Sequence, residues 1–261
     1  MNERSGATAI LEVHELGVRF GGVVALDGAS FAIQPGQICG LIGPNGAGKT
    51  TLFNVVSRLY EPTRGRVTFD GIDLLALAPH QVASVGVART FQNLALFPAL
   101  SVLENVIVGA HHTSKANFVT GALRLPGVRA EERRVRERCT ELLERLGLAP
   151  FARHPAAGLP YGTLKRVEIA RALAGEPRLL LLDEPASGLT HAEVDELGDV
   201  IMQLRSTFSL TVLLVEHHMS LVMRISDHVV ALDLGSKIAE GTPGEVANDP
   251  RVIGAYLGGV T

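Results

Sequence analysis

An eight-residue loop between an apolar run and a helical pattern limits the choice of folds more than any other segment. Gly43–Thr50 reads Gly-Pro-Asn-Gly-Ala-Gly-Lys-Thr, which matches the pattern Gly-x-x-x-x-Gly-Lys-Ser/Thr without a gap. The continuous apolar run Ile38–Ile42 precedes it, and apolar residues at helical spacing follow from Leu52 to Leu59. The glycines allow a bend in which several backbone N–H groups point inward at the positive end of the helix. The segment therefore predicts a site for a nucleoside triphosphate.

The side chains of this loop add a charge and a metal ligand to the backbone donors. Lys49 provides a mobile positive charge for the β and γ phosphates, and the Thr50 hydroxyl is a hard oxygen ligand suited to Mg²⁺. We expect the nucleotide to contact the whole loop and the residue after it. These residues are Gly43, Pro44, Asn45, Gly46, Ala47, Gly48, Lys49, Thr50 and Thr51.

Two adjacent carboxylates follow a second apolar strand. Asp183 and Glu184 come directly after Leu179–Leu182, and such a strand places them at the carboxyl edge of a sheet, where ligands of open α/β sheets bind. Taken alone, the pair is equally consistent with a strand-end cap. Together with the loop at 43–50, it predicts that Asp183 holds Mg²⁺ through water and that Glu184 orients and polarises an attacking water.

Composition and charge exclude several classes of protein. The chain has 24 Lys and Arg against 27 Asp and Glu, a formal net charge of −3, which does not supply the positive field that nucleic-acid binding requires. No apolar stretch approaches the roughly 18 residues of a membrane-spanning helix. The first residues lack a signal-peptide pattern, so we expect a cytosolic location. Cys39 and Cys139 are expected to be reduced, structural thiols.

The rest of the chain predicts an α/β fold with a mostly parallel sheet and a helical insertion. The charge-rich segment Ala130–Leu146 has apolar residues three or four apart, which indicates an amphipathic helix with a solvated charged face. Thr190 and Glu193 have capping-box spacing at the start of a helix from His191 to about Leu204. The other expected elements are strands at Ile10–Phe20, Ser30–Ile33, Gly65–Phe69, Leu210–Val215 and His228–Leu232, and a short helical segment at Pro79–Ser84.

The order of motifs resembles that of the ATPase subunits of ABC transporters. Besides Gly43–Thr51, the resemblance rests on four segments spread over the chain. They are Gln92 within Arg89–Asn93, Leu159–Thr163 ahead of Arg166–Leu173, Asp183–Pro185, and Val215–His217. Within that family, Phe91–Leu94, His111–Arg133 and Val252–Gly258 look like the branched-chain amino-acid importer group.

The resemblance spans Phe20 to Leu257 and implies an architecture. Residues 1–261 would form a single ABC ATPase domain with a P-loop NTPase core and an N-terminal antiparallel β subdomain. A helical subdomain of about 89–166 would be inserted into the core. A C-terminal extension would cover about 240–261.

The resemblance also implies a role for each matching residue. Phe20 would stack on the adenine, unless it is a core phenylalanine of a strand. Gln92 would touch Mg²⁺ or the attacking water, unless it is a solvent-facing loop residue. His217 would hydrogen-bond the γ-phosphate, with His218 pointing elsewhere if the segment is extended. The signature segment Leu159, Pro160, Tyr161, Gly162 and Thr163 would grip the γ-phosphate of ATP bound to another subunit.

Three positions depart from the family pattern. Pro160 replaces the usual serine and Thr163 the usual glutamine of the signature, which removes one hydroxyl donor and shortens another side chain. Thr190 stands at the aspartate position of Ser187–Thr190, the segment that contacts the other subunit in the family. These departures fit a heterodimer of two unequal ATPase subunits, although a homodimer remains open.

The implied function is an ATP- and Mg²⁺-dependent motor at the cytoplasmic face of the membrane. Its implied partners are two transmembrane permease subunits, a second ATPase subunit and, indirectly, an extracytoplasmic solute-binding protein. The implied cargo is a branched-chain or related amino acid, with urea or amides as alternatives. A GTPase switch would need an Asn/Thr-Lys-x-Asp motif, which the sequence lacks. A chromosome ATPase would need coiled-coil arms or a basic face, and a small-molecule kinase would leave the segments at 159–163 and 215–217 unexplained.

Overall fold

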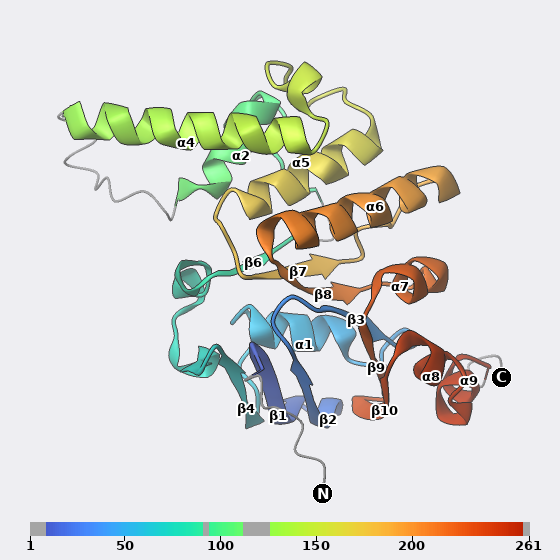
Figure 1. The fold of residues 1–261 in the computed structure, drawn as a ribbon. Helices are drawn as coiled ribbons and strands as arrows, with labels where there is room; N and C mark the ends of the chain where they lie inside the picture. Colours follow the sequence, from blue (N-terminus) through green and yellow to red (C-terminus); the bar gives the residue numbers. More distant parts are fainter. Residues whose placement is uncertain (1–8, 91–93, 112–125, 258–261) are drawn as a thin grey trace, which may run out of the picture.

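A six-stranded sheet forms the centre of the part of the chain described by the computed structural model, residues 9–90, 94–111 and 126–257 (Figure 1). The strand order is β10-β9-β3-β8-β7-β6. All neighbours are parallel except β10, which runs antiparallel to β9. The strands are β3 (Ile38–Ile42), β6 (Val87–Arg89), β7 (Leu179–Asp183), β8 (Thr211–Val215), β9 (His228–Asp233) and β10 (Ser236–Gly241).

The central strands are buried on both faces, as continuous apolar runs predict. All residues of β3, β7 and β8 are buried. Along β7, Leu179 and Leu181 pack into one hydrophobic cluster, whereas Leu180 and Leu182 pack into the cluster on the opposite face. This alternation follows from the two-residue period of a strand, and it gives the sheet a core on each side.

One face of the sheet is covered by helix α1 (Lys49–Val56) and a second, antiparallel sheet of order β2-β1-β4-β5. Its strands are β1 (Leu11–Phe20), β2 (Val23–Ile33), β4 (Arg64–Phe69) and β5 (Ile72–Asp73). Strand β2 begins at Val23 rather than at the expected Ser30, because the hairpin pairs Phe20 with Val23 and extends the ladder to the turn. Figure 1 shows this sheet below α1.

The other face is covered by α5 (Tyr161–Leu173), α6 (His191–Phe208) and α7 (Met219–Ile225). Helix α6 begins at the expected residue, where the Thr190 side chain accepts a hydrogen bond from the Glu193 amide and Glu193 accepts one from the Thr190 amide at 2.9 Å. The predicted capping box is confirmed. The helix runs four residues beyond the expected Leu204 and ends where Ser209 adopts a left-handed conformation.

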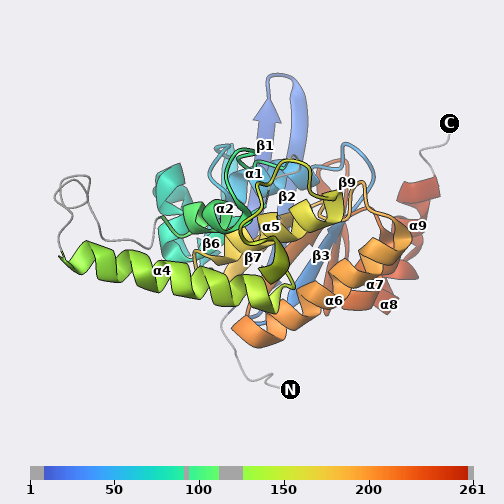
Figure 2. The same ribbon diagram turned by 90° about the horizontal axis from the view of Figure 1, so that it is seen from above.

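The segment between β6 and β7 carries helices α2 (Val102–Gly109), α4 (Pro126–Arg145) and α5, which lie together at the top of Figure 1. Figure 2 looks down on this group. The predicted amphipathic helix is confirmed as the C-terminal part of α4, where Cys139, Leu142 and Leu143 are buried. A short 3₁₀ turn, η5 (Ala149–Phe151), leads from α4 towards α5.

The short helical segment expected at Pro79–Ser84 consists of two 3₁₀ turns, η2 (Pro79–Gln81) and η3 (Ala83–Val85). Their bonds span three residues, from the Gln81 amide to Ala78 and from the Gly86 amide to Ala83. Gly86 ends the second turn with φ of 98°. A further 3₁₀ turn, η1 (Leu74–Ala76), precedes them.

Two short helices, α8 (Pro243–Ala247) and α9 (Pro250–Leu257), end the described chain beside β10. Cys39 and Cys139 are both buried and unpaired, and burial raises the pKa of each thiol. Among the described residues, no helix combines the length and apolar character that crossing a membrane requires.

Candidate nucleotide-binding site

The fold brings four sequence-distant segments to one edge of the central sheet. Strands β3, β8, β7 and β6 are neighbours and run in the same direction. Their carboxyl ends therefore lie side by side, which is where ligands of open α/β sheets bind. The loop at 43–50 follows β3, Asp183 and Glu184 end β7, residues 216–217 follow β8, and Thr90 follows β6.

The loop at 43–50 depends on its glycines for both backbone conformation and space. Gly46 and Gly48 have φ of 82° and 100°, in the left-handed region that other residues rarely adopt. A Cβ atom on Gly43 would lie 2.2 Å from the carbonyl oxygen of Leu232. The loop rests against the turn after β9 through the Gly235 amide, which donates to the Ala47 carbonyl at 3.1 Å. Asn45, Gly46 and Thr50 remain exposed, so a ligand can reach the loop.

Lys49 lies against the inside of this loop. Its ammonium donates to the carbonyl oxygens of Gly43 at 2.7 Å and Pro44 at 2.9 Å. Burial lowers the pKa of Lys49, and attraction by Glu184 opposes that shift. The predicted phosphate-binding charge and the predicted water-orienting carboxylate are therefore within electrostatic reach of each other.

Asp183 is held by a buried guanidinium. Arg89 Nη2 lies 2.7 Å from Asp183 Oδ2, and the two side chains are only 9% and 5% exposed. The other terminal nitrogen of Arg89 donates to Asn54 Oδ1 at 2.8 Å and Ser57 Oγ at 2.9 Å, both on or just after α1. This network joins the end of β6, the end of β7 and the helix that follows the loop at 43–50.

Glu184 occupies a constrained backbone position. Its φ is 46°, in the left-handed region, and its amide donates to the Val215 carbonyl at 2.9 Å. The side chain is half-buried. A non-glycine residue in this region costs free energy and is common at functional sites, so the position agrees with a defined role for the carboxylate.

The donor set at this edge suits Mg²⁺. The Thr50 hydroxyl and the Asp183 carboxylate are hard oxygen ligands, which Mg²⁺ prefers. Asp183 ends β7, beside the strand that adjoins β3 and its loop at 43–50, and its carboxylate is paired with the guanidinium of Arg89. The residues present therefore fit the metal that the sequence predicts.

The segment after β8 is anchored by a buried carboxylate. Glu216 is fully buried and accepts hydrogen bonds from the backbone amides of Ala186 at 2.6 Å, His217 at 3.0 Å and His218 at 3.3 Å. Ala186 lies two residues after Glu184, so Glu216 ties the loop of Glu184 to the loop of His217. The His217 side chain is 55% exposed, and its Nδ1 lies 3.8 Å from Glu216 Oε2.

His218 does not point away from His217, contrary to the expectation for an extended segment. The two rings lie side by side, with centroids 4.6 Å apart and an interplanar angle of 36°. The reason is that α7 begins at Met219 and His218 is its N-cap residue. The chain has already left the extended conformation at this point, so the two-residue alternation of a strand does not apply.

The structure leaves the predicted roles of Phe20 and Gln92 untested. Phe20 is 46% exposed at the end of β1, which excludes a core position, and its ring makes an edge contact with Tyr60 at a centroid distance of 5.2 Å. Its stacking on adenine stays a prediction. Gln92 falls outside the described residues, between Thr90 and Leu94.

The signature segment forms the start of α5. Pro160 is the exposed N-cap residue of α5 and makes no side-chain cap bond, and Tyr161 is also exposed. Leu159 and Thr163 are half-buried. Gly162 is buried because the Glu193 side chain packs on it: a Cβ there would lie 2.9 Å from Glu193 Oε1. The exposed residues at the start of α5 are therefore Pro160 and Tyr161, and the first turn of a helix carries backbone amides without intrahelical partners.

Sequence reasoning assigned no role to Arg89, Asn54, Glu216 and Tyr256. The Tyr256 hydroxyl on α9 accepts a hydrogen bond from the Gly43 amide at 2.8 Å, across 213 residues of sequence. Arg89 is the last residue of strand β6, and Glu216 follows the apolar strand β8 directly. That placement of a charge is the sequence signal by which they could have been found.

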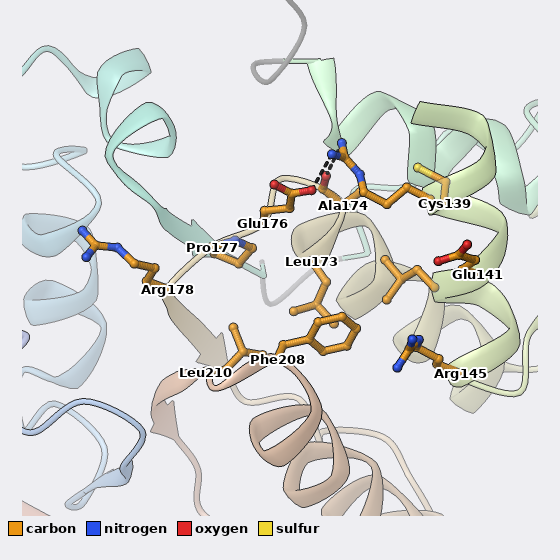
Figure 3. A pocket seen from close by; sticks show the side chains of 12 residues that line it. Cys139, Glu141, Arg145, Leu173, Ala174, Glu176, Pro177, Arg178, Phe208 and Leu210 are labelled. Atoms are coloured by element: carbon orange, nitrogen blue, oxygen red, sulfur yellow. Dashed lines mark hydrogen bonds and ion pairs between the residues drawn. The ribbon is translucent and has the colours of Figure 1, made fainter. Parts of the chain in front are cut away.

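A cavity of about 360 Å³ lies at the other end of β7, between α4, α5 and the end of α6 (Figure 3). Arg145 stacks over the Phe208 ring at 5.8 Å, and Arg138 pairs with Glu176. Because Asp183 ends β7 and Arg178 stands just before its start, this cavity is separate from the predicted nucleotide site.

A glycine loop at the end of a central parallel strand and an acidic pair at the end of a nearby strand define the P-loop NTPase class. Within that class, the chain belongs to the ABC transporter family, whose sequence profile matches residues 26–187. A second profile, described as branched-chain amino acid ATP-binding cassette transporter, matches residues 236–260. The predicted fold class and family are confirmed, and the chain is an ABC-type ATPase.

Known proteins agree with this assignment over nearly the whole chain. The high-affinity branched-chain amino acid transport ATP-binding protein BraF of Pseudomonas aeruginosa is 45% identical, covering 95% of this chain and 98% of its own length. The corresponding protein LivG of Escherichia coli is 42% identical with the same coverage. The crystal structure of the ADP conformation of the ATP-binding cassette MJ1267 superposes with a TM-score of 0.84 at 30% identity, covering 96% of this chain and 99% of that one.

Proposed function

We propose that this chain is the ATP-hydrolysing subunit of an importer for branched-chain or related amino acids. The observation that carries the proposal is the meeting of the 43–50 loop, the 183–184 carboxylates and the 216–217 segment at one sheet edge. The cargo class is supported by the names of the relatives BraF and LivG and by the C-terminal profile match. Urea or amides are the alternative cargo.

Each residue of the proposed site has its own role in ATP hydrolysis. The loop amides and Lys49 bind the phosphate chain, Glu184 orients and polarises the attacking water, and His217 hydrogen-bonds the γ-phosphate. Thr50 and Asp183 would hold Mg²⁺, which supplies charge neutralisation on the phosphates. Gln92 is proposed to contact the metal or the water.

A second ATPase subunit completes the site in this proposal. The exposed start of α5 presents Leu159–Thr163 to the nucleotide of the other chain, and the related cassette MJ0796, 26% identical, has been solved as a dimer. The Thr190 hydroxyl already accepts a hydrogen bond from the Glu193 amide as the cap of α6. It is therefore less able than an aspartate to contact another subunit. Pro160, Thr163 and Thr190 together favour an unequal heterodimer over a homodimer.

The Pro160→Ser substitution tests this account of the signature. The serine restores a hydroxyl and a backbone N–H at the start of α5, so turnover of the assembled complex is expected to rise about tenfold, the equivalent of one charge-assisted hydrogen bond in the transition state. Phosphate release by the complex measures it. Pro243→Ser, at the first residue of α8, is the matched control and should leave turnover as it is. Equal rates for wild type and Pro160→Ser would dismiss the proposed weakness of this site.

The two permease subunits are proposed to dock in a groove of about 510 Å³ between the 3₁₀ turns η2 and η3, β6, α2 and α5. Its rim carries the exposed apolar side chains of Leu59, Phe97 and Val108, which an apolar helix of a partner could cover. Arg89 and Ala95 line the groove and stand on either side of Gln92 in the sequence. The subunit would then associate peripherally with the cytoplasmic face of the membrane, and the solute-binding protein would act from the other side.

Purification of the tagged chain from membranes tests the partners and the cargo together. We expect two membrane proteins and a second ATPase to co-purify, and the reconstituted complex with its binding protein to take up leucine or isoleucine on addition of ATP. Uptake of urea or amides instead would shift the cargo assignment. Hydrolysis of GTP in preference to ATP, or phosphoryl transfer to a small molecule, would reject the proposed class.

A further inference from the structure

Asp183, the proposed Mg²⁺ ligand, is paired with the guanidinium of Arg89. The ion pair between Arg89 and Asp183 is almost completely buried, and it joins Asp183 Oδ2 to Nη2 at 2.7 Å. The same guanidinium is fixed by Asn54 and Ser57 and lies 5.6 Å from the centroid of the Phe53 ring. Arg89 is therefore anchored beside Asp183 by contacts that do not depend on the carboxylate.

We propose that Arg89 is the resident counter-ion of Asp183 and sets the Mg²⁺ concentration at which the site binds nucleotide together with metal. The inference rests on the nucleotide site of the proposed function but not on its cargo. In this proposal, Arg89 controls how tightly the site binds Mg²⁺. It does not place Arg89 in contact with the reacting atoms.

The sign of the effect follows from the charges. Mg²⁺ arriving at Asp183 must either share the carboxylate with a guanidinium or displace it, and both cost free energy because two cations then lie close together in a poorly hydrated place. Loss of the guanidinium charge would leave Asp183 without its counter-ion. Mg²⁺ would then supply the missing charge and bind more tightly.

A purely structural role for Arg89 predicts the opposite sign. If the guanidinium only held Asp183 in the orientation that the metal needs, its removal would let the carboxylate move and would weaken Mg²⁺ binding. The direction of the change in Mg²⁺ dependence therefore separates the two roles, and general damage to the fold cannot produce tighter metal binding.

The test measures binding of the ATP analogue AMP-PNP to the full chain by calorimetry over a series of Mg²⁺ concentrations. The Arg89→Gln variant is expected to lower the half-saturating Mg²⁺ concentration at least about threefold relative to wild type. The matched control is Arg178→Gln, because Arg178 also pairs with a carboxylate at 2.7 Å and stacks over a phenylalanine ring, but just before the start of β7, at the opposite end from Asp183. It should leave the Mg²⁺ dependence unchanged.

An unchanged or raised Mg²⁺ requirement in Arg89→Gln would overturn the proposal. If that variant fails to fold, nitrogen NMR of wild-type guanidinium groups gives a second test, with the Arg89 signal assigned through Arg89→Lys. The signal should shift when Mg²⁺ is added to the AMP-PNP complex, and a signal insensitive to Mg²⁺ would reject the inference. Failure of wild type to bind AMP-PNP at any Mg²⁺ concentration would instead reject the nucleotide site itself.

Discussion

Replacing Glu184 by glutamine is expected to leave ATP binding intact while turnover falls at least about 100-fold, the contribution of a positioned general base. Glutamine has the same shape, so it can keep the backbone at φ of 46° and the hydrogen bond from the residue 184 amide to Val215. It cannot polarise water as a carboxylate does. Calorimetry of ATP binding and phosphate release from the assembled complex measure the two quantities.

Glu176→Gln is the matched control for this substitution. Glu176 also has a left-handed backbone, with φ of 53°, but it pairs with Arg138 beside the cavity at the far end of β7. Its replacement should leave turnover unchanged. Turnover near that of wild type in Glu184→Gln would mean that another residue orients the water.

The Lys49→Ala variant is expected to raise the dissociation constant for ATP at least about tenfold, because hydrogen bonds from a charged group contribute about 1.5–3 kcal/mol. The structure adds a second reason. The ammonium bonds the carbonyls of Gly43 and Pro44, so its loss also loosens the loop that carries the phosphate-binding amides. Calorimetry measures the affinity for ATP. Chemical denaturation of the same variant measures its free energy of unfolding and shows whether a less stable fold contributes to the loss of affinity.

Lys237→Ala provides the comparison for Lys49→Ala. Lys237 pairs with Glu240 on β10 and is not part of the loop at 43–50, so its removal should leave ATP affinity unchanged. Wild-type affinity in Lys49→Ala would contradict the assignment of 43–50 as the phosphate loop.

Local patterns predicted most of the elements well because their causes are local. Strand β3 and the start of α6 fall at the expected residues, since a continuous apolar run and a capping box act over a few residues. The predicted ends of the strands and helices were less accurate. Strand β2 is longer than expected because its pairing with β1 continues to the turn, and the His217 and His218 rings are adjacent because a helix begins there.

The sequence by itself determined the glycine loop at 43–50, the acidic pair at a strand end and the family, because glycine conformations and strand-end carboxylates are properties of short segments. Only the tertiary structure decided that Arg89 pairs with Asp183, 94 residues away. The same holds for the Tyr256 hydroxyl, which accepts a hydrogen bond from the Gly43 amide, 213 residues away. Such contacts arise from strand order and helix packing. A single sequence gives no local signal for which distant side chains those arrangements bring together.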